Sequence, residues 1–328
     1  MRPLFRFLIL GLALWAGCSP RPASRRQEVV MGVFNEVVVL GKEKRDRERI
    51  LDRAFKLLRE IDARMSHYQE TSEISRVNRL GYESPQEVSP ETFEVIEASV
   101  KFYEKSGGVF DITVLPLVKL WGFFDGKPHL PRPEEIQNLL PRIGAHQLIL
   151  EPETRKVGFR VPGMEIDLGG IAKGYACDRV VGLLKSEGIE NALVNIGGTI
   201  FGLGRSGDGK PWRVGLQHPR DPTRTLRVIT LSNEAVSTSG DYEQFFVVDG
   251  RRYSHILNPR TGFPADRSIA ASVMAPSALL TDLLSTSLFV LGPEKASLLA
   301  DQFPEARWTL TYFSDDGRFK TLSSESVA

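Results

Sequence analysis

The chain has 328 residues, of which 41% are hydrophobic and 25% charged, and its formal net charge is +1. These proportions are ordinary for a globular protein, and the length allows one large domain or two smaller ones. Nucleic-acid-binding domains usually carry a clear basic excess, which is missing here. We therefore expect no nucleic-acid partner.

The first residues have the layout of a bacterial secretory signal. Arg2 and Arg6 precede an apolar run over residues 7–16, which is too short for a comfortable membrane span. Because the run ends at Gly17-Cys18, it resembles a lipoprotein signal, in which Cys18 becomes the lipidated first residue of the mature chain. A plain signal peptide or an uncleaved anchor is the alternative.

This amino terminus sets the expected organisation of the chain. We predict a lipoprotein signal peptide over residues 1–18, a flexible tether over 19–28, one folded domain over 29–315 and a polar tail over 316–328. The expected location is the bacterial cell envelope, with the lipid anchor in the inner membrane and the domain in the periplasm. If Cys18 carries lipid, Cys177 has no disulfide partner, and we expect it to be a small apolar core residue.

The first half of the domain alternates strand and helix signals. Residues 29–40 are β-branched and apolar, with Gly32 marking a bulge or close approach, and residues 45–61 have helical apolar spacing. The polar stretch 65–78 is either a ligand loop or a solvated surface segment. Ser89-Pro90 starts a further helix that should end near residue 105.

The next segment is rich in proline and ends in a hairpin. Residues 110–114 are expected to form a short strand or turn, and residues 134–140 a helix between prolines. Residues 148–150 and 157–159 should pair as a hairpin about Glu153-Thr154.

The stretch 165–204 carries the groups that suit phosphate. Asp167 stands where a helix N-cap would stand, Gly169-Gly170 follows, and Lys173 should lie in the first turn of a helix that ends at Gly188. Helix N-termini and nearby lysines attract anions. Neither a Walker loop nor a dinucleotide fingerprint is present. Two interpretations of the glycine pair therefore remain open: a phosphate-binding cradle, or an ordinary loop.

A strand over 193–196 leads into a second glycine pair, Gly197-Gly198, and several short strands follow. Asp249-Gly250 is a strong hairpin signal. His255 lies in the last of these strands, where the chain leaves the sheet through a turn, and it is either a structural residue or a proton carrier. The strands are expected over 212–216, 226–231, 235–238, 245–248 and 253–257.

A final helix, capped by Ser277 and running to about residue 291, is apolar on all sides and should be buried. It carries Asp282, and an unpaired buried carboxylate is costly. Ser285 and Thr286 lie one turn along, on the same face. This set suits a hard cation such as Mg²⁺, although a hydrogen bond from Asp282 to a neighbouring turn is an equal alternative.

Seven motifs occur in order along the chain: Met31-Gly32, MSHYQETSEISRVN, GGVFDIT, IDLGGIAKGYACD, NIGG, SHILNPRTG and LLTDLLSTS. In this order they resemble the ApbE family, the FAD:protein FMN transferases formerly called thiamine-biosynthesis lipoproteins. The resemblance spans about residues 29–313. It implies an α+β fold, with mixed, largely antiparallel sheets flanked by helices.

The resemblance also implies the residues of the site. The side chain that matches the family's catalytic histidine is His255, and Lys173 is the second catalytic candidate. Magnesium would be held by Gly170, through its carbonyl, and by Asp282, Ser285 and Thr286. Contacts to FAD would come from Met31, Tyr68, Val109, Phe110, Asp111, Asp167, Lys173 and Ile256. Thr199 and Asn258 depart from the family pattern, in which Asp is frequent at both positions.

The implied activity is protein flavinylation, in which FMN from FAD is joined to a Thr or Ser hydroxyl of an acceptor protein and AMP is released. Mg²⁺ and Lys173 would offset the pyrophosphate charge, and His255 would take the hydroxyl proton. Exported membrane redox-complex subunits are the implied acceptors. Two alternatives remain: a magnesium-dependent FAD pyrophosphatase, and a flavin-binding lipoprotein that needs neither His255 nor the metal site.

Overall fold

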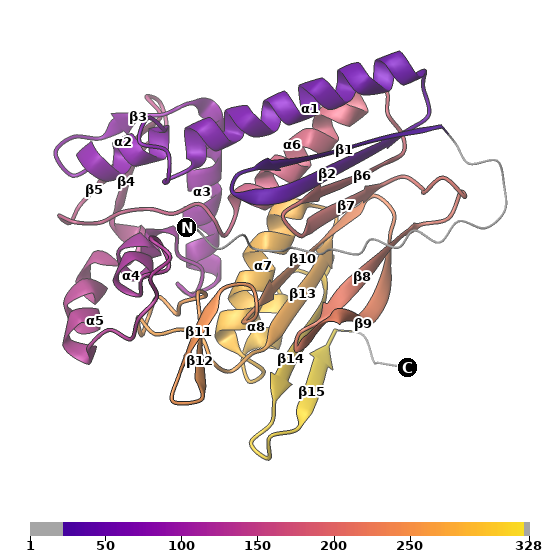
Figure 1. Cartoon of the computed structure of the whole chain (residues 1–328). Coiled ribbons are helices and arrows are strands. Elements are labelled where there is room, and N and C mark those ends of the chain that lie inside the picture. The colour runs from indigo at the N-terminus through magenta and orange to yellow at the C-terminus, as the bar shows by residue number, and fades with distance from the viewer. Residues whose placement is uncertain (1–21, 325–328) are drawn as a thin grey trace.

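The computed structural model describes residues 22–324, so the predicted signal peptide, Cys18 and the start of the predicted tether lie outside it. Within that range no helix is both long and apolar enough to cross a membrane. The fold is built on an eight-stranded sheet whose neighbouring strands all pair antiparallel (Figure 1). In spatial order its strands are β1 (Ala23–Val30), β2 (Val33–Leu40), β6 (Ala192–Ile196), β7 (Thr199–Leu203), β10 (Glu234–Gly240), β13 (Ala270–Ala275), β14 (Arg307–Phe313) and β15 (Phe319–Ser323).

A layer of helices packs against this sheet. The helix α1 contacts β1 and β2, α6 contacts β6 and β7, and α7 contacts β10 and β13, while α6 lies between the other two helices. Their apolar side chains fill the space between the layers, so the helices and the sheet share one continuous core. The helices of this layer are α1 (Lys44–Met65), α6 (Ala172–Ser186), α7 (Ala278–Leu291) and the short α8 (Ala296–Ala300).

A second group of elements lies beside the helix layer, where Figure 1 draws it in purple and magenta. Part of this group has a small separate core around Trp121, to which Leu117, Ile136 and Leu257 contribute, while α2, α3 and the small sheet pack into the main core. Its helices are α2 (Glu73–Leu80), α3 (Pro90–Lys105), α4 (Leu115–Leu120) and α5 (Pro133–Leu139). Its three-stranded antiparallel sheet consists of β3 (Gln86–Glu87), β5 (Lys156–Phe159) and β4 (Leu148–Glu151).

Two separate hairpins complete the fold, β8 (Trp212–His218) with β9 (Asp221–Leu231), and β11 (Phe245–Val248) with β12 (Arg251–Ser254). The predicted Asp249-Gly250 turn joins β11 to β12, with positive φ angles of 49° and 76°. Such angles match the twist of paired strands. Phe246 and Tyr253 of this hairpin pack against the Trp121 core, which fixes the start of the segment that carries His255.

The α+β class with largely antiparallel sheets is confirmed, and so are most of the predicted helices. Ser89 caps α3 and Ser277 caps α7, each through its hydroxyl, because these side chains satisfy N–H groups left free at a helix start. Cys177 is buried in α6, and burial raises the pKa of its thiol, as expected of a core residue.

Three predictions about irregular segments are wrong. Residues 23–28 are not a tether, because β1 pairs with β2 from Ala23 to Val30. The predicted polar tail is not irregular throughout, because residues 319–323 form β15. Both strands are sheet edges with much exposed surface, so their polar composition hid them. Met31-Gly32 is a two-residue turn between β1 and β2, not a bulge within one strand.

Candidate functional site

Helices α6 and α7 touch at Gly174. A Cβ atom there would lie 2.4 Å from the carbonyl oxygen of Ala278, so no larger residue fits without movement of the helices. The N–H of Gly174 donates a 2.7 Å hydrogen bond to Oδ2 of Asp282. This close contact brings the start of α6 next to the Asp282 carboxylate.

The Asp282 carboxylate is buried and accepts several hydrogen bonds. Its Oδ1 accepts hydrogen bonds from the hydroxyl of Thr199 at 2.7 Å and from that of Ser237. Burial raises the pKa of Asp282, and the charge of Lys173 and these hydrogen bonds oppose that effect. Thr199, one of the two departures from the family pattern, therefore touches the predicted metal ligand directly.

Ser285 and Thr286 form a second hydroxyl cluster one turn along α7. Their hydroxyls lie 3.1 Å and 3.2 Å from Oγ of Ser239, and Ser285 also donates to the carbonyl of Asp282 at 3.2 Å. Among residues 22–324, no three His, Cys, Asp or Glu residues are grouped so as to hold a metal. Any cation here would thus rely on Asp282 with hydroxyl and carbonyl oxygens.

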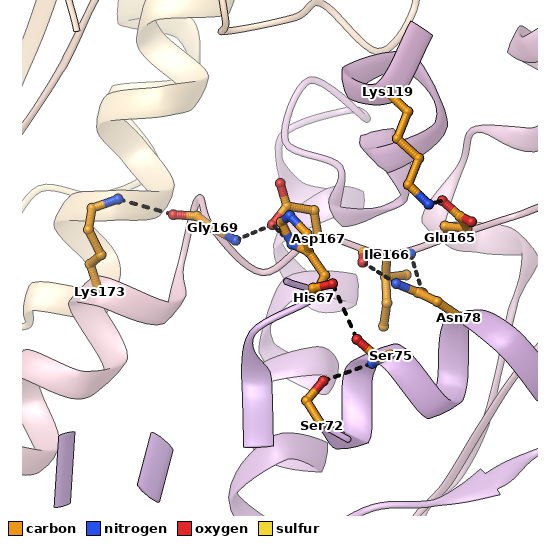
Figure 2. Close-up of polar contacts among 10 residues, drawn as sticks. All are labelled: His67, Ser72, Ser75, Asn78, Lys119, Glu165, Ile166, Asp167, Gly169 and Lys173. Carbon is orange, nitrogen blue, oxygen red and sulfur yellow. Dashed lines mark hydrogen bonds and ion pairs between the residues drawn. The ribbon is translucent and has the colours of Figure 1, made fainter. Parts of the chain in front are cut away.

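Gly170 precedes α6 in the turn that follows Asp167, where a Cβ atom would lie 3.3 Å from the ring of Phe110. Lys173 is the second residue of α6, as predicted, and its Nζ donates to the Gly169 carbonyl at 3.1 Å (Figure 2).

The charge of Lys173 acts on four nearby titratable groups. Burial is the largest influence on the pKa of each group, and the charge of Lys173 acts to lower all four pKa values. The groups are Asp167, Glu243, His255 and Asp282.

His255 directly follows β12 and is held by Gln244. Its backbone N–H donates to the Gln244 carbonyl at 3.0 Å, and its Nδ1 lies 3.2 Å from the same oxygen. A carbonyl only accepts, so Nδ1 carries the proton and Nε2 keeps a free lone pair. Burial lowers the pKa of His255 to about 4, so the ring is neutral at neutral pH. This is the form that can accept a proton.

In the segment 109–111, the groups that a ligand could contact are the backbone and the Asp111 carboxylate. Val109 and Phe110 are each only 3% exposed, with side chains in the main core. Asp111 accepts hydrogen bonds from the backbone N–H and hydroxyl of Thr113 at 2.8 Å and 2.7 Å, and burial raises its pKa. Asp111 and Arg260 both line a cavity of about 260 Å³.

The other predicted FAD contacts differ in exposure. Tyr68 is 61% exposed, and its ring stacks on Phe124 with centroids 5.0 Å apart. Met31 lies in the β1–β2 turn with a positive φ of 57°. The Ile256 side chain is buried, and its carbonyl accepts from the N–H of Ala265 at 2.9 Å. Of these three, Tyr68 alone presents a broad side-chain surface to a planar ligand.

Asp167 is not the N-cap that the sequence predicted, because α6 begins five residues later, at Ala172. Its Oδ1 accepts from the N–H of Gly169 at 2.7 Å and lies 2.9 Å from Nδ1 of His67 (Figure 2). Burial acts to raise the pKa of Asp167, but His67, Gly169 and Lys173 outweigh it and leave the value below normal. Asp167 is therefore an ionised carboxylate with a fixed orientation.

The structure thus groups four of the predicted residues: Lys173, His255, Asp167 and Asp282. Three others have buried side chains, so they can offer a ligand chiefly their backbone: Val109, Phe110 and Ile256. Sequence reasoning assigned no role to five polar side chains here. Four come from strands or loops far from Asp282 in sequence and carry no local signal, whereas one lies in the polar stretch 65–78, which was noted as a candidate ligand loop. They are Thr199, Ser237, Ser239, Glu243 and His67.

Comparison with known proteins gives full-length matches. The chain is 35% identical to the FAD:protein FMN transferase of Vibrio cholerae, covering 97% of this chain and 96% of the relative. It is 32% identical to the protein of the same name from Escherichia coli K12, covering 97% and 95%. These matches span both the sheet and the second group of elements.

Solved structures agree with this result. The flavin transferase ApbE of Vibrio cholerae superposes with a TM-score of 0.84 at 33% identity, covering 94% of this chain and 98% of that one. The ApbE protein of Thermotoga maritima gives 0.83 at 33% identity, covering 91% and 96%. The model of the ApbE family matches residues 31–308. The chain therefore belongs to the ApbE family.

Proposed function

We propose that this chain is an FAD:protein FMN transferase, an enzyme that moves FMN from FAD to a hydroxyl group of another protein. The observation that carries the proposal is the grouping around Lys173 of a buried carboxylate, Asp282, and a neutral imidazole, His255. Relatives over nearly the whole chain bear this name. The grouping supplies positive charge for a pyrophosphate and a base for a hydroxyl.

The reaction is a phosphoryl-group displacement. The acceptor's Thr or Ser oxygen forms a bond to the phosphorus next to riboflavin, and the bond from that phosphorus to the oxygen shared with AMP breaks. The hydroxyl proton passes to Nε2 of His255, whose lone pair is free because Nδ1 is bound to Gln244. AMP leaves with the shared oxygen, and Lys173 offsets the charge that develops on it.

The residues around Asp282 fit a magnesium ion. Burial raises the pKa of this carboxyl, so a nearby cation would stabilise its charged form. Among the described residues Oδ2 accepts one hydrogen bond, from Gly174, which leaves a second lone pair for a ligand. We propose that Asp282, with the Ser285 and Thr286 hydroxyls and the Gly170 carbonyl, would hold Mg²⁺. Bound there, Mg²⁺ would neutralise pyrophosphate charge.

The test is to incubate the protein with FAD, Mg²⁺ and a candidate acceptor, then to denature the mixture and look for flavin fluorescence in the acceptor band. We expect covalent fluorescence that needs all three components and a matching release of AMP. Release of free FMN and AMP without labelled acceptor would make the protein an FAD pyrophosphatase. Binding of FAD without either product would make it a flavin carrier.

We further propose that the enzyme acts at the cell envelope. The apolar run and Cys18 suggest a lipid anchor in the inner membrane, with the domain in the periplasm. Exported subunits of membrane redox complexes would then be the acceptors within reach. Fractionation of cells that express the full chain, together with labelling of membrane proteins by flavin fluorescence, tests both points.

A further inference from the structure

His67 is a buried histidine that contacts Asp167. It lies in the turn between α1 and α2, and its side chain is 8% exposed. Its carbonyl accepts a hydrogen bond from the hydroxyl of Ser75 at 3.2 Å, and Ser72 caps the same first turn of α2 (Figure 2). Nε2 is buried without a hydrogen-bond partner among residues 22–324. A buried polar atom of this kind calls for an explanation.

The other ring nitrogen has one partner, the Asp167 carboxylate. Because an ionised carboxylate only accepts, the Nδ1 atom of His67 must donate the 2.9 Å contact. The N–H of Gly169 donates to the same oxygen, Oδ1. In the described part of the chain no hydrogen bond ends on Oδ2. Two donors therefore fix the carboxylate and leave Oδ2 able to accept from a ligand.

The backbone on both sides of this contact is also fixed. The Asn78 side chain makes a pair of hydrogen bonds to Ile166, donating to its carbonyl at 2.9 Å and accepting from its N–H at 2.7 Å (Figure 2). The N–H of Asp167 donates to the carbonyl of Ile112 at 2.7 Å. The remaining freedom of Asp167 is rotation of its side chain, and His67 restricts that rotation.

An aromatic surface adjoins the pair. The His67 ring lies 4.1 Å from the Tyr68 ring between centroids, and Tyr68 stacks on Phe124 at an interplanar angle of 11°. Lys119 places its Nζ 5.2 Å from the Phe124 centroid. A planar heterocycle that stacks on the exposed Tyr68 ring would lie beside the Asp167 carboxylate. Phosphates would be repelled by Asp167, whereas N–H and O–H donors would be attracted.

We propose that His67 is a positioning residue for the flavin half of FAD: it holds Asp167 so that Oδ2 accepts a hydrogen bond from a flavin N–H or ribityl O–H. The inference rests on the proposed function, because it takes FAD as the substrate. It predicts that His67 governs FAD affinity and leaves the rate of the bound complex nearly unchanged.

The first test is direct binding of FAD to the purified mature chain by calorimetry. His67→Leu removes the Nδ1 donor and should weaken FAD binding roughly tenfold or more, as expected for a hydrogen bond to a charged group. His67→Asn keeps a donor near the position of Nδ1 and should restore most of the affinity, whereas His67→Gln, with its donor near Nε2, should not. His218→Leu on β8 is the control and should bind normally.

A double-mutant cycle with Asp167→Asn then asks whether His67 acts through Asp167. If it does, His67→Leu has little further effect once the carboxylate is replaced. FMN and AMP serve as separate probes, and His67→Leu should weaken FMN binding while leaving AMP binding unchanged. At saturating FAD the transfer rate of His67→Leu should stay within a few-fold of wild type, so the loss would appear in KM and not in kcat.

Several results would overturn the inference: wild-type FAD affinity in His67→Leu, equal losses in His67→Leu and His67→Asn, additive effects with Asp167→Asn, or a loss confined to AMP. A wild-type chain that does not bind FAD would instead overturn the proposed function, and it would do so before any variant was made. The two failures are therefore distinguishable.

Discussion

His255 and Asp282 are each held by neutral partners, and each keeps a lone pair that a ligand can use. The Gln244 carbonyl fixes His255 through Nδ1, and the Gly174 N–H with two hydroxyls fixes Asp282. A neutral partner orients a side chain without adding charge that would compete with the substrate. At the scale of single residues, the site is thus a set of oriented groups whose remaining charge comes chiefly from Lys173 and the carboxylates.

Replacing His255 with Ala or Gln should slow transfer by roughly 10²-fold or more, because the proposed base for the hydroxyl proton is lost. FAD affinity and melting temperature should change little, since the other site groups stay in place. Calorimetry, thermal unfolding and transfer rates measured side by side test this. A loss of FAD binding large enough to explain the lost activity would show that His255 has a structural role.

The pH dependence of the wild type follows from the same residue. As the proposed base, His255 is active in its neutral form, and burial lowers its pKa to about 4, so activity should persist below the usual histidine range and fall only as the pH approaches about 4. The measurement is the single-turnover rate of transfer at saturating FAD across the acid range. A midpoint near the ordinary value of about 6.5 would contradict the proposed environment of His255.

Asp282→Ala should abolish magnesium-dependent transfer. It should also destabilise the fold by about 1–3 kcal/mol, because the donors of Gly174, Thr199 and Ser237 lose their buried acceptor. Asp282→Asn keeps an acceptor oxygen and removes the charge, so it should be inactive yet more stable than Asp282→Ala. Thr286→Ala should lower magnesium-dependent transfer less than Asp282→Ala does. Normal turnover in Asp282→Ala, with an unchanged Mg²⁺ requirement, would rule out the metal assignment.

At the scale of elements, the site depends on how closely α6 approaches α7. The contact at Gly174 brings Lys173, on one helix, to the carboxylate of Asp282 on the other. The caps of α7 support the same contact, because Asp178 of α6 accepts hydrogen bonds from the Ser277 hydroxyl at 2.7 Å and the Ala278 N–H at 2.8 Å.

Gly174→Ala should therefore cost about 1–3 kcal/mol of stability and lower activity together, because the new Cβ would meet Ala278 and push the helices apart. Gly182→Ala is the matched control on the same helix, where a Cβ meets nothing within 4 Å. That control should gain up to about 1 kcal/mol from helix propensity and keep full activity. Urea unfolding and transfer assays measure both effects, and equal stability of the two variants would contradict the role of Gly174.

The elements also show which parts of the structure can be predicted from the sequence. Local signals predicted the helix starts at Ser89 and Ser277 and the Asp249-Gly250 turn, since these depend on neighbours in the chain. Asp167 looked like a cap, but a tertiary contact with His67 decides its role. Family resemblance located Lys173 and Asp282, whereas the donors from β7 and β10 could not be foreseen because strand order in the sheet brings them there.

At the scale of the whole molecule, the two groups of elements contribute different parts of the site. The helix layer on the large sheet supplies Lys173 and Asp282, and the second group supplies His67, Tyr68 and Asp111. One continuous core extends through α1, α3, α6 and α7, which makes the two groups a single folded unit. The family assignment, over residues 31–308, covers both of them.

The early start of β1 gives the proposed membrane attachment a geometric limit. The strand β1 begins at Ala23, and the five residues from Cys18 to Ala23 span at most roughly 18 Å when fully extended. A lipid at Cys18 would therefore hold the start of β1 close to the membrane surface. Membrane acceptors would then meet an enzyme of restricted orientation.

Cys18→Ser should move the protein from the membrane fraction to the soluble fraction of the envelope, because the proposed lipidation at this residue would supply the acyl chains that anchor it. Transfer to a soluble acceptor should remain near the wild-type rate, since the site lies within residues 22–324, while labelling of membrane acceptors in cells should fall. Cys177→Ser is the control, because that cysteine is buried in α6 and should not affect location. Fractionation followed by immunoblotting measures the distribution. An unchanged membrane fraction for Cys18→Ser would show that the chain is held by its apolar run or by a partner, and the lipid anchor would have to be abandoned.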